Sequence, residues 1–186
     1  MKSSDLFEQD RRTIRSISSY DSLFIDVEGI SQIKEIFFTL LNDFPDSDFE
    51  CLQLQLEQFC SIFKLIASNK QILNNFQIQS FSFIQESDFS NIIYSLIMNQ
   101  TLDPILQKKV LNILSYLISD IFSPEKYTFI EDDEFLNQLL TILKTNDESF
   151  LILHECLNLI INILKFYPNS IFLLDKSGII NYIATE

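Results

Sequence analysis

His154 and Cys156 come closest to a chemical motif in this sequence, because imidazole and thiolate groups are zinc ligands and also act in nucleophilic catalysis. Residues two apart point to different faces of a helix, and no second ligand pair lies nearby. His154 is the only histidine, and it stands in the middle of an apolar segment. The chain also has no glycine-rich loop to hold phosphates. We therefore expect no catalytic residue, no metal site and no cofactor; an enzyme centred on His154 is the alternative.

The run Glu131–Glu134 is the densest acidic cluster in the sequence. Such a cluster could bind a cation or a basic partner. It also stands where a helix is predicted to begin, and carboxylates there complement the helix dipole and cap free backbone N–H groups. We favour helix capping over ligand binding for this cluster.

A third candidate group consists of polar residues on two long, otherwise apolar stretches: Asn112, Tyr116, Asn158 and Asn162. These stretches, VLNILSYLI from residue 110 and CLNLIINIL from residue 156, match at an interval of 46 residues. Polar residues in such positions can line the inner groove of a helical stack, so we take these four as partner-binding candidates. The alternative is that they satisfy hydrogen bonds between neighbouring helices with no ligand present.

The elements that would position these residues are helices, since two glycines and four prolines are too few for a β-rich fold with many tight turns. We predict one long helix over the segment DPILQKKVLNILSYLISDIF, residues 103–122, with Asp103 able to cap it and Pro104 suited to its first turn. Its apolar residues recur at spacings of three and four: Leu106, Val110, Ile113, Leu114, Leu117 and Ile121.

A second long helix is predicted before Pro168, which should end it. Thr145 and Glu148 form a capping box at its start. Its predicted apolar face consists of Phe150, Leu153, Leu157, Ile160, Ile161 and Leu164. Leu159 and Ile163 make other faces apolar as well, so we expect this helix to be covered on more than one side.

An earlier helix ending at Ser68 has the apolar stripe Leu56, Phe59, Cys60 and Phe63. The three cysteines, Cys51, Cys60 and Cys156, are predicted to be buried free thiols, because an odd set within apolar helical patterns does not suit a disulfide framework.

Four segments of the chain share one pattern, and they start near residues 24, 83, 129 and 173. Each has two bulky apolar residues, four mostly polar ones, an apolar residue, any residue, and then Asn or Gln. The apolar column holds Ile30, Phe89, Phe135 and Ile179, and the polar column holds Gln32, Asn91, Asn137 and Asn181. The later spacings fit helical repeats of about 40 to 47 residues. The first spacing is longer, and residues 42–50 are the predicted inserted loop.

The segment CLNLIINILKFYPNSIFLLDKSGIINYI, residues 156–183, resembles an armadillo repeat, in which a long third helix, a loop and the next first and second helices follow in order. Gly29 and Gly178 occupy the family's glycine column, where Asp88 and Glu134 stand in the other copies. The resemblance implies an all-α, armadillo-like or HEAT-like right-handed α-solenoid of about three repeats. Its expected extent is residues 21–186, after a polar N-terminal segment, residues 1–20.

Importin-alpha proteins belong to this family, and their third helices carry a Trp followed four residues later by an Asn. In those proteins the Trp and Asn residues together bind basic peptides. This chain has no Trp; Asn112 and Asn158 stand at the Trp positions, and Asn162 alone matches a ladder Asn. This departure argues against the family's usual mode of binding nuclear-localisation signals.

Charge and hydropathy restrict the partners further. A net charge of −13 disfavours nucleic acid, whose phosphates require clustered Lys and Arg, and an acidic surface would attract basic segments. No apolar run is long enough to insert in a membrane, and the N-terminus lacks the apolar core of a signal peptide. We therefore expect a cytoplasmic or nuclear protein.

From the residues and the resemblance together, we expect a non-enzymatic scaffold or adaptor that binds a protein or peptide through its concave helical face. One alternative is an importin-alpha-like adaptor that binds basic peptides. Another is a structural or assembly subunit that contacts its partners through the ends of the solenoid, including end-to-end association with itself.

Overall fold

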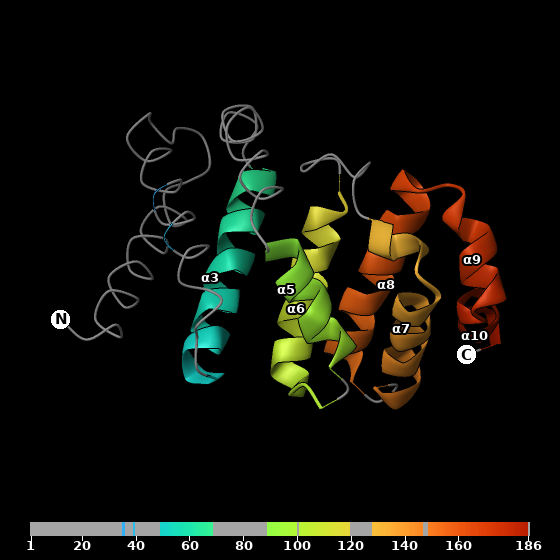
Figure 1. The fold of residues 1–186 in the computed structure, drawn as a ribbon, viewed down its shortest axis with the longest axis horizontal. Helices are drawn as coiled ribbons and strands as arrows, with labels where there is room; N and C mark the ends of the chain where they lie inside the picture. Colours follow the sequence, from blue (N-terminus) through green and yellow to red (C-terminus); the bar gives the residue numbers. More distant parts are fainter. Residues whose placement is uncertain are drawn as a thin grey trace. The chain divides into compact units, whose positions relative to one another are not determined.

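The computed structural model describes residues 35, 39, 49–68, 89–99, 101–119, 128–146 and 149–185, and every secondary-structure element in these ranges is helical (Figure 1). The described part of the chain is thus all-α, as predicted. The chain divides into two compact units, residues 1–92 and residues 93–186. Several sequence features lie outside the described residues: segment 1–20, the first repeat copy with Gly29, Ile30 and Gln32, loop residues 42–48, and Asp88, Ile121 and Glu148.

Helix α3 (Phe49–Ser68) is the long helix of the first unit, and it ends at Ser68 as predicted. Leu56, Phe59 and Phe63 from its predicted stripe are fully buried. The ring of Phe59 lies 4.7 Å from that of Phe89, which begins α5 (Phe89–Met98). The prediction that all three cysteines are buried is wrong for Cys51 and Cys60, which are only half-buried on α3.

Helix α5 continues into the second unit, whose other elements follow in chain order: α6 (Pro104–Leu117), η3 (Thr128–Glu131), α7 (Asp133–Thr145), α8 (Phe150–Phe166), α9 (Ser170–Lys176) and α10 (Ile179–Thr185). The long helices α6 and α8 pack against each other, while α7 packs against α8, α9, α10 and η3. Buried apolar side chains from α6, α7 and α8 form most of the core of this unit.

The start of α6 follows the prediction, because the carboxylate of Asp103 accepts a hydrogen bond from the Ile105 amide at 2.8 Å and Pro104 is the first helical residue. The prediction that one helix covers the whole segment to residue 122 is wrong, since α6 ends at Leu117. Ser119 closes the helix there: its amide and its hydroxyl both donate to the carbonyl of Tyr116, at 3.1 and 2.6 Å. A bond to the residue three back tightens the last turn and ends the α-helical pattern.

The predicted capping box at Thr145 is also wrong. Thr145 is the last residue of α7, and its hydroxyl donates to the carbonyl of Thr141 in the preceding turn at 2.9 Å. Helix α8 instead begins after Ser149, whose side chain makes no capping hydrogen bond. It ends at Phe166, two residues before Pro168, in agreement with the prediction.

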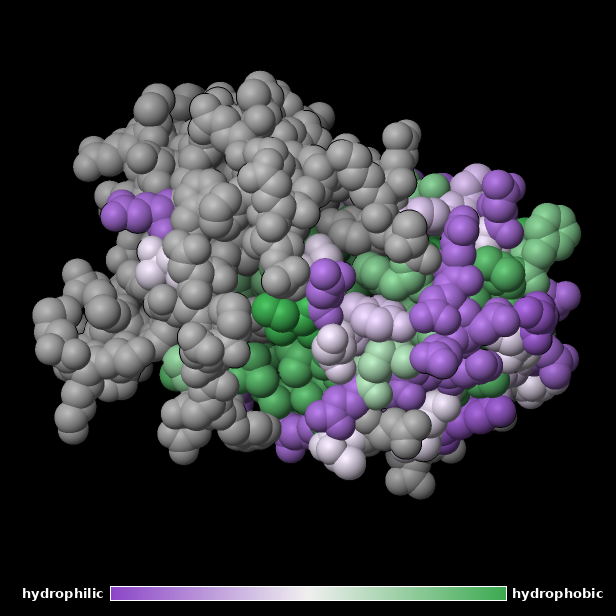
Figure 2. All heavy atoms as spheres, viewed as in Figure 1, coloured by the Kyte–Doolittle hydropathy of each residue, from purple (hydrophilic) through white to green (hydrophobic). Residues whose placement is uncertain are grey.

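Helix α8 has two apolar faces, and the core face is not the predicted one. The buried side chains are Ile152, Cys156, Leu159, Ile160 and Ile163. Of the face predicted from sequence, Ile160 alone is buried; Leu153, Leu157 and Leu164 are half-buried, and Phe150 and Ile161 are exposed. Large apolar residues thus reach the surface of the second unit. On the face drawn in Figure 2, hydrophobic residues (green) are visible among hydrophilic ones (purple).

Gly178 forms the corner between the short helices α9 and α10. Its φ of +84° lies in the left-handed region that favours glycine, which explains a scarce residue at this position. In the preceding copy the corner uses Asp132, with φ −81°, so no glycine is needed where Glu134 stands in the glycine column. The described members of the apolar column, Phe89, Phe135 and Ile179, are all buried.

Candidate functional site

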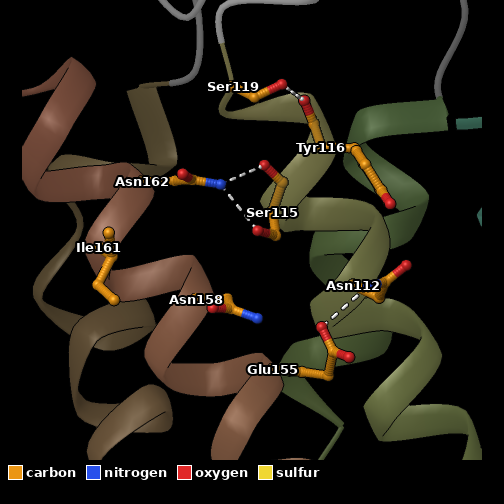
Figure 3. A pocket seen from close by; sticks show the side chains of 8 residues that line it. All are labelled: Asn112, Ser115, Tyr116, Ser119, Glu155, Asn158, Ile161 and Asn162. Carbon is orange, nitrogen blue, oxygen red and sulfur yellow. Dashed lines mark hydrogen bonds between the residues drawn. The ribbon is translucent and has the colours of Figure 1, made fainter. Parts of the chain in front are cut away.

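A pocket of about 290 Å³ lies between α6 and α8 (Figure 3). All four partner-binding candidates, Asn112, Tyr116, Asn158 and Asn162, line it. The remaining lining residues were not among the partner-binding candidates: Ser115, Ser119, Glu155 and Ile161. We call this space the α6–α8 pocket. One site is therefore built from residues that lie about 46 positions apart along the chain.

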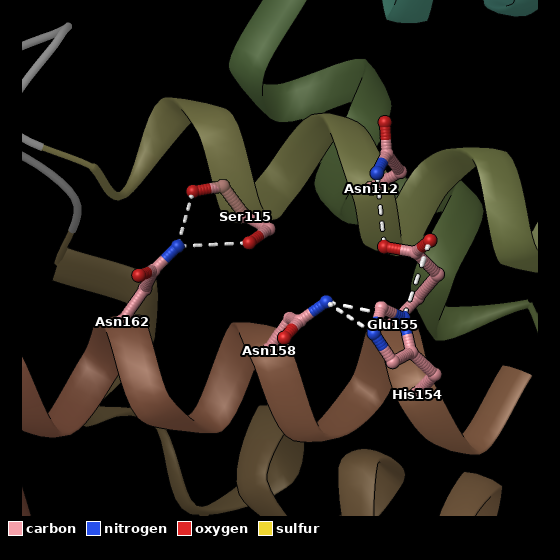
Figure 4. Close-up of polar contacts among 6 residues, drawn as sticks. All are labelled: Asn112, Ser115, His154, Glu155, Asn158 and Asn162. Atoms are coloured by element: carbon pink, nitrogen blue, oxygen red, sulfur yellow. Dashed lines mark hydrogen bonds and ion pairs between the residues drawn. The ribbon is translucent and has the colours of Figure 1, made fainter. Parts of the chain in front are cut away.

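The pocket forms because α6 and α8 run side by side in the same direction. Asn112 on α6 contacts Glu155 on α8, and three residues further along α6, Ser115 contacts Asn162 (Figure 4). Contacts that advance together along both helices require parallel chains. Asn158 and Asn162 are four residues apart, so they project from the same side of α8.

Asn162 fastens the two helices together. Its side-chain nitrogen donates to the carbonyl of Ser115 at 2.9 Å and to the hydroxyl of Ser115 at 2.8 Å. That carbonyl belongs to the last turn of α6, where carbonyl oxygens lack a partner within the helix. Asn162 therefore caps α6 from the neighbouring helix, which supports the structural alternative for this residue.

Asn112 adds a further bond between the helices by donating to Glu155 Oε2 at 2.9 Å. The side chain of Glu155 is only 14% exposed. Among the eight residues that line the pocket, Glu155 is the one carboxylate, and none is a lysine or an arginine. The pocket thus presents an anionic group held by a neutral amide.

Asn158 differs from the other two asparagines, because its contact stays within its own helix. Its side-chain nitrogen lies 3.2 Å from Nδ1 of His154, one turn earlier on α8. An amide nitrogen donates, so this contact is a hydrogen bond in the tautomer whose Nδ1 has a free lone pair. The same Nδ1 is 3.8 Å from Glu155 Oε1, and protonation of the exposed imidazole would turn that contact into an ion pair (Figure 4).

Tyr116 lines the pocket from α6 with its backbone end, and Figure 3 shows its side chain directed away from α8. Its carbonyl accepts the Ser119 hydroxyl bond that closes α6. The sequence does contain a signal for the residues that were missed: Ser115 interrupts the apolar stretch beside Tyr116, and Glu155 stands one turn before Asn158. A search for all polar positions on the first stretch would have found Ser115, and extending the second stretch by one residue would have found Glu155.

The acidic run at residues 131–134 begins α7, as the capping interpretation predicts. Asp132 is the N-cap, and its carboxylate accepts from the Glu134 amide at 2.9 Å and from the Tyr94 hydroxyl at 2.7 Å. The hydrogen bond from the Tyr94 hydroxyl, and to a lesser extent the one from the Glu134 amide, lowers the pKa of Asp132 below its ordinary value. Burial and the bond to Asp132 raise the pKa of Tyr94 to about 12. Asp132 is thus engaged in holding the start of the helix.

His154 and Cys156 lie on different faces of α8, as their spacing predicts. The imidazole is 56% exposed, whereas the Cys156 thiol is fully buried and lies 3.9 Å from the carbonyl of Leu139. Burial raises the pKa of this thiol to about 12, so it stays protonated at neutral pH. Within the described ranges, no three His, Cys, Asp or Glu side chains converge as a metal site would require.

Comparison of the chain with protein-family models, with curated proteins and with solved structures finds no significant match. Among the helices that the structure describes, none has both the length and the apolar composition to cross a membrane.

Proposed function

We propose that this chain is a non-enzymatic, armadillo-like α-solenoid scaffold that binds a protein or peptide segment at the α6–α8 pocket. The observation that carries the proposal is the convergence of Asn112, Asn158 and Asn162, from matching positions of two long helices, on one open pocket. Parallel neighbouring helices with a repeated register are what a stack of helical repeats supplies.

The chemistry of the pocket suits a polypeptide. Amide and hydroxyl side chains both donate and accept hydrogen bonds, as peptide groups do, and Ile161 adds an exposed apolar contact at the edge. The volume of about 290 Å³ is at the small end of ligand pockets, and it matches one or two side chains of a partner. A partner segment lying across α6 and α8 would insert a side chain here.

The contacts of His154 support a non-enzymatic role. Its imidazole contacts Asn158, Glu155 and the ring of Phe150, none of which is a serine or cysteine nucleophile. The buried Cys156 thiol is protonated, and the Ser115 hydroxyl is occupied by Asn162. Among the residues that the structure describes, this base contacts no serine or cysteine nucleophile, and a base alone does not make a nucleophilic catalytic device.

Asn158 is the residue with which to test binding, because its removal leaves the hydrogen bonds that Asn112 and Asn162 make between α6 and α8 intact. Peptides selected from a random display library on the immobilised chain would be labelled, and their affinity measured by fluorescence anisotropy. We expect Asn158→Ala to weaken the binding of the selected peptides about fivefold, since one hydrogen bond to the partner is worth roughly 1 kcal/mol.

Asn137→Ala is the matched control, because Asn137 is an exposed asparagine on α7 that does not line the pocket. It should leave the affinity unchanged. Peptides that bind wild type and Asn158→Ala equally well, or that lose affinity with Asn137→Ala, would place the binding surface elsewhere on the chain.

A basic peptide is a second candidate ligand, favoured by Glu155 as the single charged residue among those lining the pocket. Its carboxylate would pair with a lysine or arginine of the partner, and the net charge of −13 would attract such a segment. Glu155→Gln retains an acceptor for Asn112 while removing the charge. Loss of affinity for Lys- and Arg-containing peptides, with a weaker dependence on salt, would support this ligand; unchanged affinity would exclude it.

A further inference from the structure

Glu155 carries a charge that its described neighbours compensate only in part. Its mostly buried side chain accepts one hydrogen bond, from the neutral amide of Asn112 to Oε2. Within the described ranges, the ion-pair contact of Oε1 is with His154 Nδ1 at 3.8 Å, and no lysine or arginine contacts it. Removing a carboxylate from water costs free energy unless a cation or several hydrogen-bond donors replace the lost hydration. Oε1 is therefore the atom of the pocket that is best suited to a cation supplied by a partner.

Two exposed aromatic rings lie next to this carboxylate, on the first two turns of α8. The imidazole of His154 contacts Glu155, and the ring of Phe150 lies 6.2 Å from that imidazole, centroid to centroid, with 33° between the two planes. Figure 4 shows the imidazole beside both Asn158 and Glu155. We call Phe150 and His154 the α8 aromatic pair. A carboxylate beside exposed rings is a site for a cation that can also stack.

We propose that this cation is the guanidinium group of an arginine in the partner segment, stacked on the α8 aromatic pair and hydrogen-bonded to Glu155 Oε1. The inference rests on the proposed function, because it requires a partner segment at the α6–α8 pocket. A guanidinium group is planar, so it donates hydrogen bonds from its edge while its face stacks on an aromatic ring. A lysine ammonium is a compact, strongly hydrated charge without a flat face, and it would gain less from the two rings.

Charge complementarity supports a cationic side chain at this place. None of the residues that line the pocket is a lysine or an arginine, so no cation of the lining competes with the ligand for Glu155. The net charge of −13 would also attract a basic segment from a distance. His154 is the one described group that would compete, because a protonated imidazole would itself pair with Glu155. Binding is therefore best measured at pH 8, since histidines change charge between about pH 5 and 8.

Two pentapeptides with blocked ends, Ala-Ala-Arg-Ala-Ala and Ala-Ala-Lys-Ala-Ala, test the preference for arginine. Titration of each into the nitrogen-15-labelled full chain, followed by NMR, gives both dissociation constants. We expect the arginine peptide to bind about threefold more tightly, and to shift the amide resonances of residues 150–158, because stacking of a cation on an exposed ring is a small but measurable effect. His154→Ala should remove the preference, whereas His154→Phe, which retains an aromatic face, should keep it.

Phe172→Ala is the matched control, because Phe172 on α9 is 77% exposed and Phe150 is 75% exposed. Phe150→Ala should reduce the preference for arginine, and Phe172→Ala should leave it unchanged. Equal binding of the two peptides to wild type overturns the inference, as does a preference for arginine that survives both His154→Ala and Phe150→Ala. Neither result affects the proposed function, which fails separately if the peptides selected by display bind wild type and Asn158→Ala equally well.

Discussion

Replacing Asn162 with alanine tests whether this residue is structural, and Asn158→Ala provides the contrast within the same pocket. Asn162 donates two hydrogen bonds to Ser115 on α6, whereas Asn158 contacts the exposed imidazole of His154 on its own helix. The two asparagines occupy adjacent turns of α8 and differ mainly in their hydrogen-bond partners. Substitution of each should therefore change stability by very different amounts.

The magnitude follows from the two bonds. Each contributes a net of roughly 1 kcal/mol, and removing Asn162 leaves the carbonyl of a buried serine without its partner, so Asn162→Ala should cost about 2 kcal/mol. Ser115→Ala removes the hydroxyl bond alone and should cost about 1 kcal/mol or less. Asn158→Ala removes a contact between residues four apart on a helix surface, worth about 0.2–0.5 kcal/mol.

Urea unfolding followed by circular dichroism at 222 nm measures these differences as shifts in the unfolding midpoint at constant slope. In the double variant, the Ser115→Ala change should add almost nothing to Asn162→Ala, because the bond they share is already lost. The resulting coupling energy should be about 1 kcal/mol. The reasoning is refuted if Asn162→Ala costs no more than Asn158→Ala, or if the coupling is zero.

Two further predictions concern the helix boundaries. Gly178→Ala should destabilise α10 by about 1–2 kcal/mol, since a φ of +84° disfavours a Cβ even where the nearest side-chain atom is 3.9 Å away. Gly178→Asn should cost less, because asparagine tolerates this conformation better than alanine. Hydrogen exchange of the Tyr182 amide, which donates to the Gly178 carbonyl, measures both effects, and equal protection in the two variants would contradict the prediction. Because the pKa of Asp132 is lowered in the folded state, its contribution to folding stability is present above the ordinary pKa of 3.8 and is lost as pH falls through the folded pKa. Because the pKa of Tyr94 is raised to about 12, its contribution to folding stability is present below pH 10 and is lost as pH rises toward 12. Tyr94→Phe should flatten both limbs of a stability–pH curve, and an unchanged curve would refute the link.

Features set by local chemistry were predictable from the sequence. The Asp103–Pro104 start of α6 and the carboxylate cap of α7 depend on residues next to each other in the chain, and both are observed. The glycine corner at residue 178 is similar, because backbone conformation alone requires it. The interval of 46 residues also located the four pocket candidates without any knowledge of the packing.

Features that depend on neighbouring helices were not predictable in the same way. Two faces of α8 are apolar, and periodicity cannot tell which of them faces the core; of the predicted face, Ile160 alone is buried. Thr145 had the residue type of an N-cap, but its hydroxyl bonds backwards into α7. The role of Asn162 needed the position of the α6 carbonyls, which no local pattern records.

The bond from Asn162 to Ser115 spans 47 residues of chain and ties the end of one long helix to the middle of the next. Helix α6 can therefore complete its own backbone hydrogen bonding at this carbonyl only after α8 has been synthesised and docked. During synthesis, α6 would lack this hydrogen bond until α8 has formed and docked. The final stability of the last turn of α6 therefore depends on the docking of α8.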